Sequence, residues 1–330
     1  MGKKSKKILL EEKIEKEKNY NFLQRAYVYQ KERFPILMFA FYIMCIAIGV
    51  FFITDHYAMH EDGKLVKNVV ETIYYTRNYI NLVPMFLVGF LQFFMVRIVD
   101  EFKDYEEDCK YRNYRPVPRG LIKLDTLKTL FVICILLQFI ITLAFGGSLI
   151  FLLILWCAFL LLAKDFYIKD FLSRHILIGV LFDEILMPIL ALLMASFCVD
   201  ESLLFYLIGN TGFIYLIYIT YIISWIVEVA RKIRCKKDEE KGVKTYTAVF
   251  GIPKATLILG ILELFVYMIQ LEILQRNYEY DCLAIYLIVM SINILFVITE
   301  NRFFSKLVEL SANTYIAFVY LSFIVLAFPI

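Results

Sequence analysis

Three aspartates spaced four residues apart are the part of this sequence with the clearest chemical meaning. Asp100, Asp104 and Asp108 follow a long apolar segment, and a continuous helix would place all three on one face. Like charges at this spacing repel each other, so a cation between them would stabilise the array. Carboxylate oxygens are the ligands that Mg²⁺ prefers, and Mg²⁺ often recruits substrate phosphates. The spacing therefore predicts a Mg²⁺ and diphosphate site at a membrane surface.

The composition places these residues in a membrane protein. The chain has 330 residues, 61% of them hydrophobic, and a mean hydropathy of +0.68, whereas soluble domains are only about half apolar. Apolar segments of roughly 17 to 25 residues, long enough to cross the hydrocarbon core, recur along the sequence. They predict an all-α polytopic membrane bundle of about nine transmembrane helices around a central cavity. The predicted spans are residues 35–54, 80–99, 124–145, 147–163, 176–198, 204–227, 255–274, 281–299 and 313–329.

Positive charge predicts the orientation of this bundle. With nine spans and a cytosolic N-terminus, the cytosolic segments hold 31 of the 35 Lys and Arg residues, and such residues favour the cytosolic side. The chain then divides into a basic cytosolic N-terminal arm, residues 1–34, and an intramembrane domain, residues 35–330. We expect an integral multi-pass protein of the cell membrane, with the loops after the second and sixth spans in the cytosol.

Those two loops carry charges of both signs. Carboxylates hold metal ions, whereas Arg and Lys neutralise phosphate oxygens. The candidate metal ligands are Asp100, Asp104, Asp108, Glu228 and Asp238. The candidate diphosphate contacts are Arg97, Lys103, Arg115, Arg119, Arg231, Lys232, Arg234 and Lys244. The same basic residues also fit a simple orientation signal, and Asp238 with Glu239 and Glu240 also fits an ordinary charge cluster.

An acidic pair also lies inside the fifth predicted span. Asp183 and Glu184 sit within an apolar run, and ionisable groups at membrane depth are costly unless they are functional or paired. Either carboxylate could activate an acceptor hydroxyl, and either could instead be paired structurally inside the bundle. We take Asp183 as a candidate catalytic residue.

Two segments carry a resemblance to a known family. The first reads Asp100-x-x-x-Asp104-x-x-x-Asp108 and continues to Arg115-Pro116-x-Pro118-x-Gly120. The second reads Gly242-Val243-Lys244-Thr245 and ends in Phe250-Gly251. The first resembles the leading aspartate-rich signature of the UbiA superfamily of intramembrane prenyltransferases, and the second resembles the segment after that family's second signature. With nine spans and these loop positions, the resemblance covers most of the chain.

The resemblance implies an activity. A prenyl diphosphate would bind with its diphosphate under Mg²⁺ and basic residues, and an aromatic or lipid acceptor would capture the carbocation left by ionisation. Asp100, Asp104, Asp108 and Asp183 are then the candidate catalytic residues, with membrane lipid as a partner. No nucleic-acid-binding module is apparent.

The second motif departs from the family pattern. Arg234 stands four residues before Asp238, where an acid is expected, and Arg231 and Lys232 add further positive charge. We therefore expect the first motif to carry most of the metal binding and the second loop to contact diphosphate directly.

Three other functions stay open on the sequence alone. The carbocation could be captured by the substrate's own double bond, as in a terpene cyclase. The protein could instead be a transporter, although its carboxylates gather at one face and no internal repeat is evident. A catalytically inactive lipid-binding relative is the third possibility. If adding an acceptor changes the product, the reaction is transfer and not cyclisation. Ion flux through the protein would instead identify a transporter.

Overall fold

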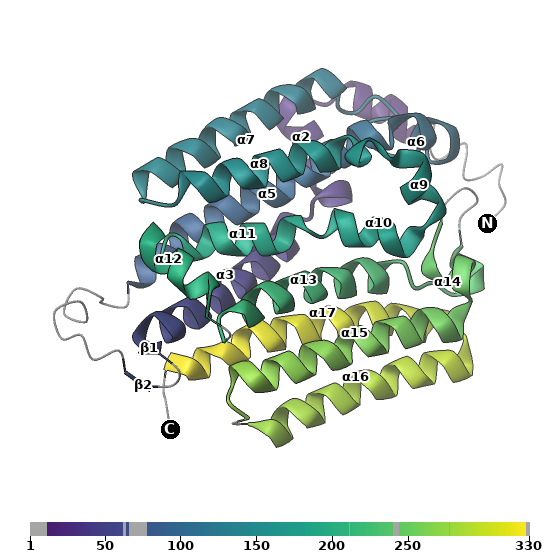
Figure 1. The fold of residues 1–330 in the computed structure, drawn as a ribbon. Helices are drawn as coiled ribbons and strands as arrows, with labels where there is room; N and C mark the ends of the chain where they lie inside the picture. Colours follow the sequence, from purple (N-terminus) through teal and green to yellow (C-terminus); the bar gives the residue numbers. More distant parts are fainter. Residues whose placement is uncertain are drawn as a thin grey trace. The chain divides into compact units, whose positions relative to one another are not determined.

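Apolar sequence of this length folds into helices because a membrane leaves no water to satisfy backbone polar groups. The computed structural model describes residues 12–61, 64–65, 78–210, 212–239, 244–276 and 278–327. Within these residues the chain is almost entirely helical, which confirms the predicted all-α class (Figure 1). The described strands are only the paired β1, His60–Glu61, and β2, Lys64–Leu65.

Eight of the described helical segments are long and apolar enough to cross a membrane. They are α3 (Ile36–Met59), η1 with α5 (Tyr79–Asn81 and Leu82–Lys103), α7 (Leu124–Ala144), α10 with α11 (Ile176–Asp183 and Leu186–Ala195), α13 (Ile214–Arg231), α15 (Ile252–Ile273), α16 (Glu279–Thr299), and α17 with η4 (Arg302–Ser322 and Phe323–Ala327). The shorter elements are α2 (Phe22–Arg33), α6 (Tyr105–Tyr111), α8 (Leu149–Ala163), η2 (Asp165–Tyr167), α9 (Lys169–Arg174), α12 (Glu201–Ile208), η3 (Lys236–Asp238) and α14 (Tyr246–Phe250).

Helix α8 corresponds to the fourth predicted span, residues 147–163. It has 15 residues and is wholly apolar. The backbone N–H of its N-cap residue, Ser148, donates a hydrogen bond at 2.9 Å to Oγ of Ser196, which follows α11. The start of α8 therefore lies beside the end of α11, and the two helices pack against each other along their lengths. Among the described residues, eight long helices and α8 agree with the expectation of about nine spans.

Two predicted spans are interrupted. The segment predicted over 176–198 breaks at Glu184 and Ile185, between α10 and α11. The segment predicted over 204–227 is two helices, α12 and α13, because Asn210 turns the chain between them. Its Oδ1 accepts hydrogen bonds from the backbone N–H groups of Gly212 and Phe213, at 2.8 and 3.2 Å. A side chain that satisfies nearby backbone donors favours a turn over a continued helix.

The chain forms two compact units, and the boundaries between them fall inside α3, α5 and α7. Unit 1 comprises Met1–Ile43 and Phe86–Ile141, and unit 2 comprises Met44–Met85 and Thr142–Ile330. In unit 2, α13, α15, α16 and α17 pack side by side (Figure 1). The buried Asn293 side chain of α16 donates to Glu263 of α15 at 2.6 Å, so a polar pair joins these two helices.

Unit 1 places the N-terminal arm against the first motif. Residues 12–18 are helical, and Asn21 with Gln24 forms a capping box that begins α2. Tyr29 of α2 packs in a buried cluster with Ile98 of α5, Val117 and Leu127 of α7. The part of the arm that the structure describes is thus packed onto the helices that carry the aspartates.

Candidate functional site

The backbone carries the first motif through a bend without losing its helical hydrogen bonds. Helix α5 ends at Lys103 and α6 begins at Tyr105. Even so, the backbone N–H of Asp104 donates to the backbone carbonyl of Asp100 at 2.9 Å. The backbone N–H of Asp108 likewise donates to the backbone carbonyl of Asp104 at 2.8 Å. Helical backbone hydrogen bonds between residues four apart therefore connect all three aspartates.

Arginines neutralise these carboxylates. Arg97 Nη1 lies 3.4 Å from Asp100 Oδ2, one turn back on α5. Arg115 bridges the other two, because its Nη1 lies 2.5 Å from Asp108 Oδ2 and 3.9 Å from Asp104 Oδ2. Ion pairs replace the mutual repulsion expected of three carboxylates. The structure thus brings Asp104, Asp108 and Arg115 together.

Asp108 differs from the other two aspartates in its burial. Its side chain is 1% exposed, whereas those of Asp100 and Asp104 are 37% and 46% exposed. Its Oδ1 lies 3.3 Å from Arg112 Nη1 but accepts no hydrogen bond. In the described part of the chain, no three His, Cys, Asp or Glu side chains already converge on a metal position. The array is therefore a set of carboxylates paired with arginines.

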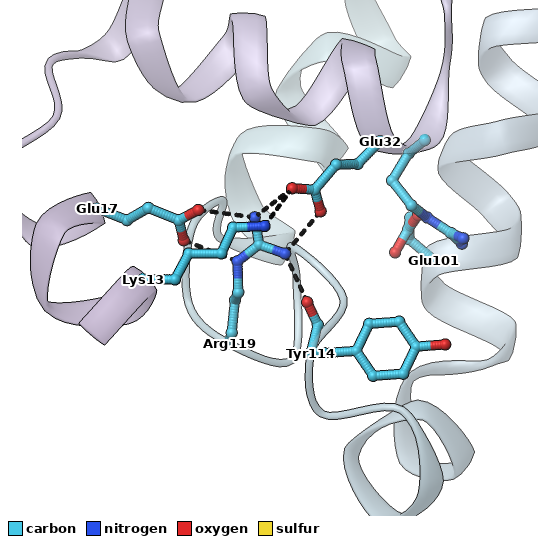
Figure 2. Close-up of polar contacts among 7 residues, drawn as sticks. Lys13, Glu17, Glu32, Glu101, Tyr114 and Arg119 are labelled. Carbon is cyan, nitrogen blue, oxygen red and sulfur yellow. Dashed lines mark hydrogen bonds and ion pairs between the residues drawn. The ribbon is translucent and has the colours of Figure 1, made fainter. Parts of the chain in front are cut away.

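Arg119, at the end of the first motif, has other partners. Its side chain is fully buried and binds Glu17 and Glu32 of the N-terminal arm (Figure 2). Its Nη1 also donates to the backbone carbonyl of Tyr114 at 2.5 Å. Lys103, another predicted diphosphate contact, is half-buried at the last position of α5.

The second motif begins with an acidic residue enclosed by cations. Glu228 lies in the last turn of α13, and its side chain is 13% exposed. Its carboxylate binds Arg231 Nη2 at 2.5 Å and also binds the ammonium group of Lys232. Two of the predicted diphosphate contacts therefore gather around one predicted metal ligand.

Asp238, the other predicted ligand of this loop, faces different partners. Its Oδ2 lies 2.9 Å from Arg302 Nε and accepts from Cys235 Sγ at 3.4 Å. Glu228 and Asp238 thus form ion pairs with different basic side chains. Lys244 is exposed at the start of the segment that leads into α14.

Threonine hydroxyl groups form hydrogen bonds with the last described acidic residue of this loop. Glu239 accepts hydrogen bonds from Thr245 and Thr247, each at 2.7 Å. Thr247 Oγ1 in turn accepts from the backbone N–H of Arg234 at 3.1 Å. The residues Glu240, Gly242 and Val243 of the predicted motif lie outside the described residues.

The intramembrane acidic pair lies where α10 gives way to α11. Asp183 ends α10 and is exposed, whereas Glu184 is less exposed and lies near Ser224 of α13. Glu184 also lies within electrostatic range of Glu228. Asp183 stays a predicted catalytic residue, and Glu184 lies within range of the second motif. Adjacent residues on a helix point about 100° apart, so spacing alone could not decide which faces α13.

The first motif belongs to unit 1, while the acidic pair and the second motif belong to unit 2. The structure therefore describes each of these residue groups within its own unit.

Comparisons with known proteins bear on both motifs. The chain is similar in fold to a solved structure reported as "Structural and mechanistic insights into the biosynthesis of Digeranylgeranylglyceryl phosphate synthase in membranes", with a TM-score of 0.54 and 17% sequence identity. The match covers 88% of this chain and 98% of the other. No curated protein sequence matches significantly. A model described as the UbiA prenyltransferase family matches residues 73–326, which include both motifs and most of the chain. This integral membrane protein therefore belongs to the UbiA prenyltransferase family.

Proposed function

We propose that this protein transfers a prenyl group from an isoprenyl diphosphate to a lipid or aromatic acceptor within the membrane, and that the transfer depends on Mg²⁺. The observation that carries the proposal is the array of Asp100, Asp104 and Asp108 with its arginines, at the end of a membrane-spanning helix in a UbiA chain.

The donor atoms of this array suit a hard divalent cation. Asp100 and Asp104 are accessible, and the buried Oδ1 of Asp108 accepts no hydrogen bond, so carboxylate oxygens remain to coordinate an ion. Mg²⁺ bound there would neutralise negative charge that develops on the leaving diphosphate. Glu228 and Asp238 stay predicted ligands from the second loop.

The basic residues supply the complementary charge. Arg115 has the planar guanidinium that binds phosphate oxygens in bidentate fashion, and diphosphate would compete with Asp108 for it. The other predicted diphosphate contacts are Arg97, Lys103, Arg231, Lys232, Arg234 and Lys244. Arg119 was predicted as a contact as well, and its side chain is fully buried among carboxylates of the arm.

The reaction breaks one bond and forms one. The allylic C–O bond of the prenyl diphosphate breaks, and its electron pair leaves with the diphosphate. The acceptor nucleophile donates an electron pair to the carbocation, forms the new bond and loses a proton. Fixed positive charge stabilises the leaving group. Asp183 stays a predicted acceptor of that proton, together with its neighbour Glu184.

Two further assignments complete the proposal. The solved structure of similar fold is named for digeranylgeranylglyceryl phosphate, so a prenylated glyceryl phosphate is the first product to test for. The excess of Lys and Arg in the motif loops supports a cytosolic position for both motifs, in the cell membrane.

The deciding experiment uses the full chain in lipid nanodiscs with radiolabelled prenyl diphosphates of graded length. Each is incubated with Mg²⁺ and a panel of phosphorylated lipid, quinone-precursor and aromatic acceptors. We expect release of diphosphate and a labelled product that forms only with an acceptor, and chelation of Mg²⁺ should abolish both. A labelled product that forms equally without acceptor would instead establish cyclisation. Absence of diphosphate release with every acceptor, together with ion flux in liposomes, would overturn the enzyme assignment in favour of a transporter.

A further inference from the structure

The N-terminal arm reaches the end of the first motif through one buried guanidinium. Arg119 Nε lies 2.7 Å from Glu17 Oε2, and Nη1 lies 2.7 Å from Glu32 Oε2. Nη2 contacts the second oxygen of each glutamate at 3.0 Å, so both pairs are bidentate. Lys13 adds a third contact to Glu32, at 2.7 Å. We call Lys13, Glu17, Glu32 and Arg119 the arm clamp; Figure 2 shows the guanidinium between the two carboxylates.

The arm clamp balances its own charge. Two carboxylates face one guanidinium and one ammonium group, so the buried Arg119 has a full set of counter-charges. A buried charge that loses its partners is strongly destabilising, which makes such a cluster hard to rearrange. Among the described residues, all the ion pairs of Arg119 are with the arm.

The clamp is connected to the aspartates through the backbone. Arg119 Nη1 donates to the carbonyl of Tyr114 at 2.5 Å, and the backbone N–H of Arg119 donates to the carbonyl of Arg115 at 3.0 Å. Arg115 is the residue whose side chain bridges Asp104 and Asp108. Holding Arg119 therefore fixes the backbone on both sides of the Tyr114–Arg115 peptide, from which that bridge projects.

A second contact secures the other end of the motif. Arg33, at the end of α2, binds Glu101, whose side chain is 1% exposed and lies between Asp100 and Asp104 in sequence. Tyr29 packs between these two attachment points, against Ile98 and Val117. The arm thus contacts the motif at its first turn and again at its last turn.

We propose that the N-terminal arm is a positioning element for the first motif, with Arg119 as its main positioning residue, acting through Glu17 and Glu32. The arm sets the position of Arg115 relative to Asp104 and Asp108. This inference rests on the proposed function for its kinetic consequences, but its structural part stands apart from any activity.

The structural test measures hydrogen exchange of backbone amides in the full chain. The variants are Glu17→Gln with Glu32→Gln, Arg119→Gln and the conservative Arg119→Lys. The matched control is Glu15→Gln, because Glu15 lies two residues from Glu17 but is 73% exposed and pairs only locally with Lys18. We expect exchange in residues 112–121 to rise about tenfold or more in the first two variants, less in Arg119→Lys, and not in the control.

The kinetic test separates positioning from a general loss of structure. A misplaced Arg115 weakens binding of diphosphate, so we expect the KM for prenyl diphosphate to rise about tenfold with a smaller change in kcat. Arg119→Lys should restore part of the affinity, because it keeps the charge that the two glutamates require.

Two results would overturn the inference. The first is unchanged exchange in residues 112–121 when the clamp is removed. The second is a rise in exchange spread evenly over α5 and α7, which would mean that Arg119 only stabilises the unit. If wild-type protein releases no diphosphate, the proposed function fails, while the exchange result still decides whether the arm positions the motif.

Discussion

At the scale of single residues, Asp104 and Asp108 share Arg115 but differ in their surroundings. Asp104 is 46% exposed and lies 3.9 Å from the guanidinium, so its carboxylate is available to a ligand. Asp108 is buried, with Arg115 at 2.5 Å and Arg112 at 3.3 Å. The Asp104 carboxylate can therefore be removed with little effect on folding, whereas the Asp108 carboxylate also contributes to stability.

We expect Asp104→Asn to lower Mg²⁺-dependent turnover about 100-fold while leaving the unfolding temperature unchanged, because it removes charge from an accessible ligand. Asp108→Asn should lower turnover equally and also cost about 1–3 kcal/mol of stability, since it weakens buried charged hydrogen bonds. Turnover assays and thermal unfolding in detergent measure the two effects.

Glu106→Gln is the control for both variants, because Glu106 is exposed on the same helix, between the two aspartates. Its turnover should equal that of the wild type. Equal losses of activity in Glu106→Gln and Asp104→Asn would show that total negative charge, rather than the aspartate array, supports the reaction.

The arm clamp should make stability depend on pH. Burial alone would raise the pKa of the Glu32 carboxyl, but hydrogen bonds from Arg119 and Lys13 outweigh it and lower the pKa below its usual value. A lowered pKa in the folded state means that the stabilisation is complete above the usual carboxyl pKa of about 4.3 and is lost as the pH falls through the folded value.

Thermal unfolding of wild type and Glu32→Gln from about pH 7 down to about pH 3 tests this dependence. We expect the wild type to be more stable near neutral pH and the two curves to converge in acid. A constant difference across this range would mean that Glu32 contributes through packing and not through its charge.

The sequence predicted part of this site because part of it is local. The interval between Asp104 and Asp108 predicts that they lie close together, and Arg115 follows within reach of both. Arg119 could not be assigned in this way, since its partners lie 87 and 102 residues earlier in the sequence. A basic residue in a phosphate-binding motif and one in a structural ion pair look the same until the partner is known.

At the scale of elements, the break between α10 and α11 distinguishes two adjacent carboxylates. Glu184 lies near Ser224 and within electrostatic range of Glu228, whereas Asp183 ends α10 and is exposed. We expect Glu184→Gln to reduce prenyl transfer about tenfold or more, with a smaller effect from Asp183→Asn, because Glu184 is less exposed and lies within electrostatic range of Glu228.

Single-turnover assays of both variants, with thermal unfolding as the check on folding, measure this difference. Asp183→Asn is the matched comparison, since it removes one negative charge from the same break. A larger loss in Asp183→Asn would identify Asp183 as the more important of the two carboxylates.

The contact between α3 and α17 depends on a glycine. A Cβ added at Gly49 would lie 2.5 Å from Cδ1 of Tyr320, whose ring is fully buried and cannot move aside easily. We expect Gly49→Ala to cost about 1–3 kcal/mol through overpacking. Gly179→Ala should be neutral or stabilising, because Gly179 is also helical and its added Cβ would meet nothing closer than 3.7 Å.

Thermal unfolding in detergent compares the two alanine variants. Equal stability of both proteins would show that the helices around Gly49 separate enough to admit a methyl group.

Helices were easier to predict than their interruptions. Long apolar runs such as those of α3 and α15 predict spans because the length of an apolar segment determines whether it can cross the hydrocarbon core. The breaks at Glu184 and Asn210 depend on which backbone and side-chain donors those residues meet. Periodicity carries no information about such partners.

At the scale of the whole molecule, the positive charge of the loops predicts which side of the membrane holds the first motif. Cys109 is a natural reporter, because it is exposed on α6 beside Asp108. In a variant that keeps only Cys109, we expect a membrane-impermeant maleimide to label the protein in permeabilised cells but not in intact cells.

Mg²⁺ with a prenyl diphosphate should protect Cys109 from this reagent, because the proposed site lies one residue away. Labelling in intact cells would place the motif outside the cell and contradict the predicted orientation.

The arm clamp also has a consequence for how the chain enters the membrane. Glu17 and Glu32 precede α3, Arg119 follows α5, and both helices are long enough to be spans. If both helices span the bilayer, the chain crosses it twice between the glutamates and Arg119, which returns Arg119 to the side that holds the glutamates. If one of these helices failed to insert during synthesis, Arg119 and its glutamates would lie on opposite sides of the membrane. Each charged side chain would then lack its partner. The same four side chains that hold the motif therefore also distinguish a correctly inserted hairpin from a faulty one.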